Sequence, residues 1–500
     1  MNKMKRILAI VLAMAMVMAM SITTLAAAGV APTPNDSAAV TIANLEDGVT
    51  LTAYQLIDAT YGEGNKNLTG YAWTTQSNFT GAVASLDQAK EKITEQYIKN
   101  LAANTTGLTA DANFKKNGDA LTAGTWMIIV TGGADKVYNP MVVSVYYNVD
   151  GTNNSLGVAT ADANTNWNMQ STPGYAKSTP ISIEKKIADS DVNSQVGQEV
   201  TFTVTSYIPS YIGNYTNVTY NISDHIVNGL EYVPGSMTVT GPTGMTDANY
   251  TVSGFKADST GFTVAFDSAY VLSEGVAKLP NEARKVTITY KAKVTNDAIV
   301  KVGENKAEVE YSKSNSTETS KKDDTEYTNT VNFKGVLKKV KENGTDPLPG
   351  ATFTLYDDQA LQNTVGSCTT TGTCGIDFEG LDADKTYYLK ETAAPAEYTL
   401  NNTVYTITFT DVQHDADGKI TSYKVKVNYT DGNGNPVEKV VDMTGYNASA
   451  VEFADTVINT KLSELPSTGG IGITIFTIAG CLIMIAAAFM FFMSRRKTEE

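Results

Sequence analysis

The sequence predicts an all-β protein made of tandem immunoglobulin-like β-sandwiches, placed between an apolar N-terminal segment and an apolar C-terminal helix. Residues 29–464 consist mostly of short runs in which apolar and polar residues alternate, as strands with one buried face require. Glycine, asparagine and aspartate separate these runs at the spacing of sandwich strands. The 500 residues are enough for about three domains.

The composition provides buried cores and excludes several functions. Apolar residues make up 42% of the chain and charged residues 18%. The net charge of −15 has the wrong sign for gathering phosphates, so nucleic acid is not an expected partner. Two histidines and three cysteines are too few for a zinc site or a Ser/His/Asp triad. We therefore expect no metal, no cofactor and no ordinary enzyme.

Residues 1–28 have the three parts of a secretory signal peptide. A basic start is followed by the apolar stretch Ile7–Met20 and by the small residues Ala26–Ala28, which have the spacing of a cleavage site. The alternative is a retained membrane anchor, for which the apolar run is short. We expect the mature chain to start near Gly29.

The other end of the chain combines three features. Residues 471–493 form an apolar run of membrane-spanning length, and the tail 494–500 is rich in basic residues, as expected on the cytoplasmic side. The bulk of the chain is then outside the cell. Directly before the apolar run stands a pentapeptide made of Leu465, Pro466, Ser467, Thr468 and Gly469.

This order of pentapeptide, apolar helix and basic tail resembles the cell-wall sorting signal of Gram-positive surface proteins. The resemblance implies that a sortase docks Leu465 and Pro466 and cleaves after Thr468. The enzyme then holds the Thr468 carbonyl as a thioester until an amine takes it. We expect the mature protein on the cell surface, anchored to the wall, after a transient membrane stage.

Two polar junctions with prolines or many charges, at 171–180 and 312–330, divide the mature chain. They predict a first domain at 29–177, a second at 178–333 and a third at 334–461. One helix is expected around 86–101, where apolar residues have helical spacing.

Cys368 and Cys374 are separated by five residues in a chain that is expected to be secreted. Oxidation is the default there, so we expect a loop-closing disulfide with a structural role. The alternative is a pair of free thiols.

A lysine of the third domain falls where a core residue belongs. Leu337 and Lys339 share one face of the first strand, so a buried Leu337 would carry Lys339 into the core. A buried lysine is costly unless it is neutralised. The alternative is a solvated basic strand.

Three segments of this domain, 335–355, 389–398 and 457–461, resemble the Cna B-type domain of Gram-positive pilins and adhesins. The resemblance implies a covalent bond between Lys339 and Asn459, assisted by Glu391. In an apolar core the pKa of the lysine falls and that of the acid rises, so a neutral amine can attack the amide while the acid shuttles protons. Glu397 stands where the family prefers glycine.

The second domain repeats this logic. Lys185 shares a strand face with Ile183 and Ile187, so it points inward. Segments 222–233 and 303–311 resemble the isopeptide-forming second domain of fimbrial backbone subunits, akin to Cna A-type domains. The resemblance implies that Asp224 is the catalytic acid and Asn305 the acceptor for Lys185. The alternative is a surface lysine and a turn aspartate.

A further lysine must stay exposed. Trp167 followed by Tyr175 and Lys177 resembles the segment with which pilus subunits present their linking lysine, although Ala176 replaces the usual proline. The resemblance implies that Lys177 attacks the Thr468 acyl-enzyme of another subunit. The alternative is an ordinary linker lysine.

Together these features favour the shaft subunit of a sortase-assembled pilus. Its expected partners are pilin-class and housekeeping sortases, copies of itself, peptidoglycan, and tip or basal pilins. Its only chemistry would be a single-turnover bond formation within the chain. A first alternative is a monomeric wall-anchored adhesin for a host matrix protein, which does not need Lys177. A second is an enzyme displayed on the wall. This alternative is disfavoured because the sequence contains no recognisable set of a nucleophile, a base and a residue that orients the base.

Overall fold

The computed structural model describes residues 29–133, 135–149, 155–158, 160–212, 215–227, 229–254, 261–314, 318–462 and 472–496. The predicted signal peptide (1–28) and the sorting pentapeptide (465–469) lie outside these residues. The chain divides into two compact units. The first reaches Thr330 and includes Ala416–Lys419, and the second comprises Val331–Asp415 and the chain from Ile420 onward.

The first domain is built on a six-stranded antiparallel sheet in the order β10-β9-β7-β3-β4-β5. Its strands are β3 (Thr50–Tyr61), β4 (Leu68–Trp73), β5 (Ala82–Val83), β7 (Gly124–Thr131), β9 (Met141–Val149) and β10 (Trp167–Ser171). Shorter pairs join β1 (Ser37–Ala39) to β6 (Ala120–Thr122), and β2 (Ile42–Ala43) to β11 (Gly174–Tyr175).

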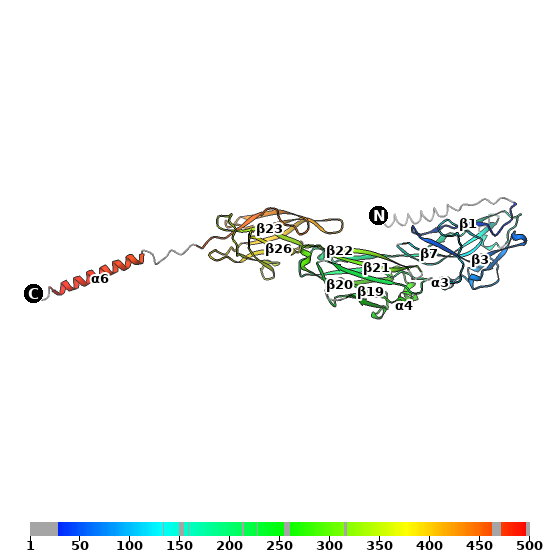
Figure 1. Cartoon of the computed structure of the whole chain (residues 1–500), viewed down its shortest axis with the longest axis horizontal. Helices are drawn as coiled ribbons and strands as arrows, with labels where there is room; N and C mark the ends of the chain where they lie inside the picture. Colours follow the sequence, from blue (N-terminus) through cyan, green and yellow to red (C-terminus); the bar gives the residue numbers. More distant parts are fainter. Residues whose placement is uncertain are drawn as a thin grey trace. The chain divides into compact units, whose positions relative to one another are not determined.

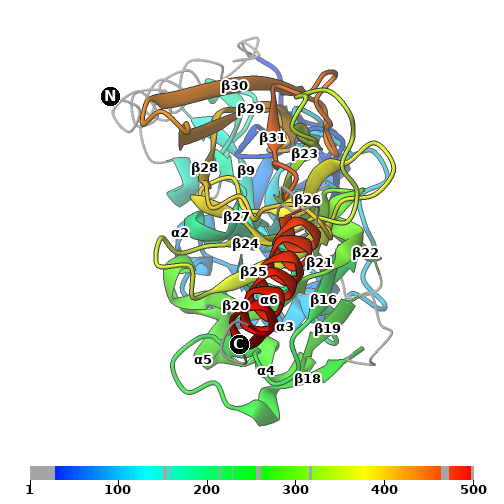
Figure 2. The same cartoon turned by 90° about the vertical axis from the view of Figure 1, so that its left-hand side faces the viewer.

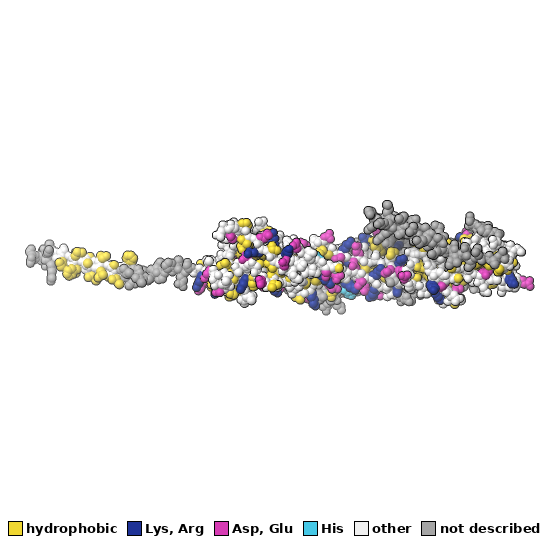
Figure 3. Space-filling model, turned by 90° about the horizontal axis from the view of Figure 1, so that it is seen from above, with side chains coloured by type: hydrophobic (Ala, Val, Ile, Leu, Met, Phe, Trp, Pro, Cys, Tyr) yellow, Lys and Arg dark blue, Asp and Glu magenta, His cyan; other side chains and the backbone are white. Residues whose placement is uncertain are grey.

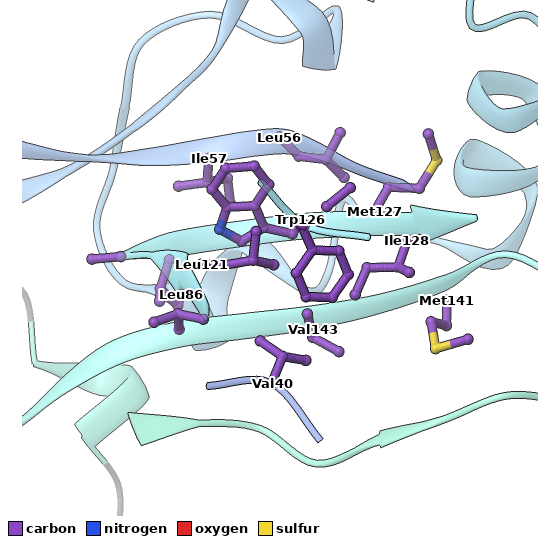
Figure 4. Close-up of a cluster of buried hydrophobic side chains, with 14 of the residues drawn as sticks. Val40, Leu56, Ile57, Leu86, Leu121, Trp126, Met127, Ile128, Met141 and Val143 are labelled. Carbon is purple, nitrogen blue, oxygen red and sulfur yellow. The ribbon is translucent and has the colours of Figure 1, made fainter. Parts of the chain in front are cut away.

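The core of this domain surrounds β7. Residues 124–130 are all buried, because β7 is a central strand that is covered on both faces. Figure 4 shows the Trp126 ring among the side chains of Ile57 and Leu121. The strand's uninterrupted apolar sequence therefore follows from its place in the sheet.

The helix expected around 86–101 is two short helices, α2 (Leu86–Ala89) and α3 (Glu95–Ala103). The Ser85 side chain caps α2, and the Thr94 hydroxyl accepts a hydrogen bond from the backbone N–H of Tyr97 at the start of α3. A new N-cap inside the segment starts a second helix, which is why the predicted helix is split.

The second domain consists of two five-stranded sheets. One contains β13 (Ile183–Ile187), β14 (Glu199–Tyr207), β20 (Lys285–Val294), β16 (Leu230–Tyr232) and β17 (Thr238–Thr240). The other contains β18 (Tyr250–Ser253), β19 (Gly261–Phe266), β15 (Tyr220–Val227), β21 (Gly303–Ser314) and β22 (Glu318–Thr328), and Figure 1 shows β21 beside β22. Two short helices, α4 (Ser268–Leu272) and α5 (Glu274–Ala277), follow β19. Burial alternates along β14, as expected for a strand with one buried face.

The first two domains contact each other within their unit. Strand β12 (Ser178–Pro180) pairs with β8 (Lys136–Tyr138), and Val137 of β8 is fully buried in the core of the second domain. The Tyr215 hydroxyl donates to the carbonyl of Tyr138 over 3.2 Å. The segment that carries Lys177 therefore lies where the two domains meet.

The third domain also has two sheets. The smaller contains β26 (Gly375–Leu381), β23 (Val331–Val340) and β31 (Asp455–Ile458) in that order. The larger contains β25 (Thr364–Thr369), β24 (Thr352–Tyr356), β27 (Tyr387–Ala393), β28 (Val404–His414), β29 (Ile420–Thr430) and β30 (Pro436–Thr444). Figure 2 shows β29 and β30 side by side. Strands β23 and β31 run parallel, so the first and last strands of the domain are neighbours.

The last described element is α6 (Gly472–Arg496). Its segment Phe476–Arg495 is long and apolar enough to cross a membrane, and none of it is buried against the rest of the chain. Hydrophobic side chains cover this helix in the space-filling view of Figure 3. An exposed apolar surface of this kind suits a bilayer rather than water.

Candidate functional site

Two lysines lie in the cores of the second and third domains. Lys185 is 1% exposed and Lys339 is 0% exposed, although lysine is almost never fully buried in proteins unless it is paired. Both occupy inward positions on the first strand of their sandwich, β13 and β23. Each therefore needs a partner inside the core.

In the third domain the partners of Lys339 are Asn459 and Glu391. The Lys339 Nζ donates to Asn459 Oδ1 over 2.5 Å and to the carbonyl of Val457 over 3.2 Å. The Asn459 Nδ2 donates to Glu391 Oε1 over 2.8 Å, and the same carboxylate oxygen lies 3.8 Å from Lys339 Nζ. The other oxygen, Oε2, accepts from the backbone N–H of Asn401 over 2.8 Å. Amine, amide and acid are thus in direct contact.

The strand arrangement explains this meeting. Parallel pairing of β23 with β31 sets Lys339 opposite Val457, two residues before Asn459. Glu391 comes from β27 of the other sheet, where it pairs with Phe353 of β24. The acid therefore reaches the lysine and the asparagine across the sandwich core, where both Glu391 and Asn459 are buried.

Burial changes the chemistry of Lys339. Loss of hydration lowers its pKa from 10.5 to about 8, and the nearby Glu391 carboxylate opposes this shift. A larger share of the amine is then neutral at neutral pH than for a solvated lysine. A neutral amine beside an amide carbonyl is a nucleophile in position to attack it.

In the second domain Lys185, Asp224 and Asn305 are brought together with Tyr290. The Lys185 Nζ donates to Asp224 Oδ2 and, over 2.8 Å, to the hydroxyl oxygen of Tyr290. The Asn305 Nδ2 donates to the same hydroxyl oxygen over 2.5 Å. All four side chains are buried. The lysine and tyrosine come from one sheet and the other two residues from the facing sheet.

The electrostatics of this group favour neutral partners. Burial lowers the pKa of Lys185, against the attraction of Asp224, and burial raises the pKa of Asp224, against the attraction of Lys185. Burial, and then the Asp224 charge, raise the pKa of Tyr290, so its hydroxyl stays protonated. Asp224 Oδ1 and Asn305 Oδ1 are buried without a hydrogen-bond partner among the described residues.

Sequence reasoning missed Tyr290 and Asn401. Tyr290 lies on the inward face of β20 between Ile288 and Ala292, where an aromatic residue is ordinary core material. Asn401 contributes its backbone N–H from a loop, so its side-chain type carries no signal. Tyr290 and Lys185 lie in the same sheet on either side of β14, and this relation appears only once the strand order is known.

Lys177, unlike Lys185 and Lys339, is exposed. It follows β11 and precedes β12, and its carbonyl accepts a hydrogen bond from the backbone N–H of Asn139 over 2.9 Å. It lines a groove of about 320 Å³ together with residues of α3, the start of β9 and Tyr175. An amine at this place is open to a large partner.

The structure does not contain the predicted disulfide, because it holds Cys368 and Cys374 as two separate cysteines. Cys368 lies on β25 of the larger sheet and pairs with Phe353, whereas Cys374 is in the turn before β26 of the smaller sheet. Cys368 is partly exposed, whereas Cys374 is buried and has a φ of 60°.

Glu397, at the position where glycine was expected by resemblance, has a φ of 70°. This left-handed conformation is costly for a residue with a side chain and free of that cost for glycine. The backbone there keeps its turn, and the Glu397 carbonyl accepts from the backbone N–H of Leu462 over 2.7 Å.

Two family models and one curated relative match the chain. Residues 333–436 match the family model of a prealbumin-like fold domain named SpaA, and residues 458–500 match that of the LPXTG cell wall anchor motif. The chain is 27% identical to the trypsin-resistant surface T6 protein of Streptococcus pyogenes serotype M6, over 93% of this chain and 96% of the relative.

Two solved structures are also similar. The T6 backbone pilin of serotype M6 Streptococcus pyogenes, described as a modular three-domain structure, superposes with a TM-score of 0.55 at 22% identity and covers 86% of this chain and 99% of its own. The full-length major pilin SpaD of Corynebacterium diphtheriae gives a TM-score of 0.46 at 18% identity, covering 86% and 98%. The first of these likenesses shows that the chain has a mostly β, multi-domain fold of the same kind.

Proposed function

Because the chain is a Gram-positive backbone pilin with a prealbumin-like domain and an LPXTG cell wall anchor, we propose that two internal Lys–Asn bonds staple its domains and that Lys177 links it to the next subunit. The protein is a structural subunit of a sortase-assembled pilus and not an enzyme. It is held at the cell surface through the LPXTG motif, with the C-terminal apolar helix behind it.

The third domain, at 334–461 and of the Cna B type in this proposal, forms its bond between Lys339 and Asn459. The neutral Lys339 amine attacks Cγ of Asn459, the Cγ–Nδ2 bond breaks, and ammonia leaves. Glu391 carries the proton from the attacking to the leaving nitrogen, because its Oε1 is near both. The contact of 2.5 Å between Lys339 Nζ and Asn459 Oδ1 is the observation that carries this proposal.

The second domain, at 178–333 and of the Cna A type, forms the corresponding bond between Lys185 and Asn305 with Asp224 as the acid. Burial of all three side chains and the contact between Lys185 and Asp224 support this assignment. The first domain, at 29–177, follows a signal peptide at 1–28. Among its described residues no lysine is buried, so it receives no such bond in this proposal.

A bond between the first and last strands of the third domain changes how a pulling force passes through it. Force enters at β23 and leaves after β31, which are parallel neighbours. Without a covalent link the hydrogen bonds between these strands carry the load. With the link, the covalent bond between Lys339 and Asn459 carries the load, and the hydrogen bonds between the two strands do not.

Polymerisation joins the Thr468 carbonyl of one subunit to the Lys177 amine of another. The exposure of Lys177 beside the groove lined by α3 supports this role, because a sortase acyl-enzyme must reach the amine. The expected partners are a pilin-class sortase for the shaft and a housekeeping sortase for transfer to peptidoglycan. Tip or basal pilins complete the fibre.

The test is a denaturing blot of boiled cell-wall extracts from cells that carry the sortases. Wild type and the control Lys116→Ala, which changes another exposed lysine of the first domain, should both give a ladder of high-mass species. Lys177→Ala should give the monomer alone. A ladder that persists in Lys177→Ala would move the link to another lysine. The absence of any ladder in wild type would favour the monomeric wall-anchored adhesin.

A further inference from the structure

The hydroxyl of Tyr290 lies at the centre of the buried group in the second domain. Its oxygen is 2.8 Å from Lys185 Nζ and 2.5 Å from Asn305 Nδ2, and both nitrogens donate to it. The ring is fully buried, is stacked on Phe202 with centroids 5.7 Å apart, and meets Phe262 edge-on at 5.0 Å. The hydroxyl therefore has a fixed position between the two nitrogens.

We propose that Tyr290 is a catalytic residue of the reaction between Lys185 and Asn305, and that its hydroxyl carries the proton from the attacking nitrogen to the leaving nitrogen. This inference rests on the bond proposed above for the second domain. Forming that bond removes one proton from Lys185 Nζ and adds one to Asn305 Nδ2, which leaves as ammonia. Tyr290 touches both of these atoms.

The contacts of the Lys185 nitrogen leave its lone pair available for attack. A neutral amine has two N–H groups and one lone pair, and here it donates to Asp224 Oδ2 and to the Tyr290 oxygen. The lone pair remains for attack on Cγ of Asn305, and the carbonyl electrons move to Oδ1. In the protonated acid Asp224 the oxygen Oδ1 is free, and Asn305 Oδ1 likewise has no hydrogen-bond partner among the described residues.

The proton is then relayed by the hydroxyl group of Tyr290. Once attack has made Cγ tetrahedral, Asn305 Nδ2 has a free lone pair and can accept a proton. The Lys185 nitrogen then gives its proton to the Tyr290 oxygen, and Tyr290 gives its own proton to Nδ2. The Cγ–Nδ2 bond breaks, the carbonyl reforms, and ammonia leaves. Tyr290 ends neutral, as it began, so the step needs no further reactant. A raised phenol pKa keeps the proton available for this transfer at neutral pH.

The third domain shows why the second needs this residue. There, Glu391 Oε1 accepts from Asn459 Nδ2 and lies 3.8 Å from Lys339 Nζ, so one carboxyl oxygen is near both nitrogens. Aspartate is one methylene shorter than glutamate. In the second domain Asp224 contacts Lys185 and is hydrogen-bonded to Tyr290, and the Tyr290 hydroxyl makes the contact with the amide of Asn305.

The experiment follows bond formation in the full chain. Cells receive a short pulse of isotope-labelled amino acids, and samples taken during the chase are denatured and digested with trypsin. Mass spectrometry then gives the linked fraction of the labelled Lys185–Asn305 and Lys339–Asn459 peptide pairs. The variants are Tyr290→Phe and the control Tyr220→Phe, which removes another fully buried hydroxyl of the domain, one that donates to Ser206 over 3.0 Å.

We expect Tyr290→Phe to slow the Lys185–Asn305 bond by about 10²-fold, the low end for proton-transfer catalysis, and to leave the Lys339–Asn459 bond at its wild-type rate. Tyr220→Phe should slow neither. A Tyr290→Phe chain that forms both bonds at the wild-type rate overturns the inference. A wild-type chain without any Lys185–Asn305 pair would instead overturn the proposed staple itself.

Resistance of the second domain to trypsin before denaturation tells whether Tyr290→Phe still folds. If it does not, 3-fluorotyrosine incorporated into wild type supplies the second measurement, because it keeps the ring and the hydroxyl but makes the phenol more acidic. The rate in the second domain should then change relative to that in the third. An unchanged ratio of the two rates would contradict proton transfer through Tyr290.

Discussion

Lys339 and Asn459 are 120 residues apart in the sequence, yet Nζ of one lies 2.5 Å from Oδ1 of the other. The parallel pairing of β23 with β31 brings them together. A bond between them would close almost the whole third domain into a loop. Its effect on stability is therefore large.

We predict that Lys339→Met, which removes the amine and keeps an apolar side chain, destabilises the third domain by about 4–5 kcal/mol, the loop-closure entropy of a cross-link across some 100 residues. Unfolding of the full chain in denaturant measures this loss in the free energy of unfolding. Cleavage of the third domain by a protease reports how much of that domain is unfolded. Lys338→Met changes the neighbouring, partly exposed lysine and should cost far less. Equal losses in the two variants would argue against a covalent link.

The two acids should act independently. Glu391→Gln keeps the size of the side chain but removes its acid–base function, so we expect the Lys339–Asn459 peptide pair to be missing and the Lys185–Asn305 pair to remain. Asp224→Asn should give the reverse pattern. Each bond releases one ammonia, so the intact mass of each variant should exceed that expected for the doubly linked chain by one ammonia. A variant that loses both bonds would point to misfolding.

Lys339 should make the stability of the third domain depend on pH only where the bond is absent. In Asn459→Ala the Lys339 amine stays free, with its pKa lowered by burial from 10.5 to about 8. The unfolded chain then binds more protons than the folded one between these values, so the stability of the third domain should rise with pH from about 8 to 10.5. Wild type should lack this rise, because an amide nitrogen does not titrate. If the free energy of unfolding changed with pH in the same way in Asn459→Ala and in wild type, the assignment would be refuted.

Cys368 and Cys374 should behave as thiols. Burial raises the pKa of Cys368 to about 11 and also raises that of Cys374, so few thiolates exist at pH 8 and alkylation of the folded chain by iodoacetamide should be slow. Denaturant without any reductant should expose both to rapid alkylation. If the denatured chain were alkylated only after reduction, Cys368 and Cys374 would form the disulfide that the sequence predicts.

The inward positions of Lys185 and Lys339 could be predicted because strand alternation alone decides which lysine of an adjacent pair faces the core. The contacts that complete each group could not. Tyr290 looks like any inward aromatic residue of β20, and its value depends on which residues of the facing sheet lie opposite. The disulfide could not be decided from the sequence either, because a spacing of five residues does not fix where the two sulfur atoms lie.

The division of residues 86–101 into α2 and α3 has a local cause. Thr94 offers a better start for a helix than a position inside one, and the periodicity of apolar residues is unchanged by the break. Periodicity therefore predicts the buried face, which includes Ile98 and Leu101, but not the continuity of the helix.

The neighbouring positions of β23 and β31 have a consequence for damage by proteases. Once Lys339 and Asn459 are joined, the chain between them is a closed covalent ring. A single cut in any surface loop of that ring, such as the turn between β29 and β30, leaves both fragments attached. A pilus built from such domains stays continuous after a first nick in each ring, and only a second cut within the same ring releases a fragment.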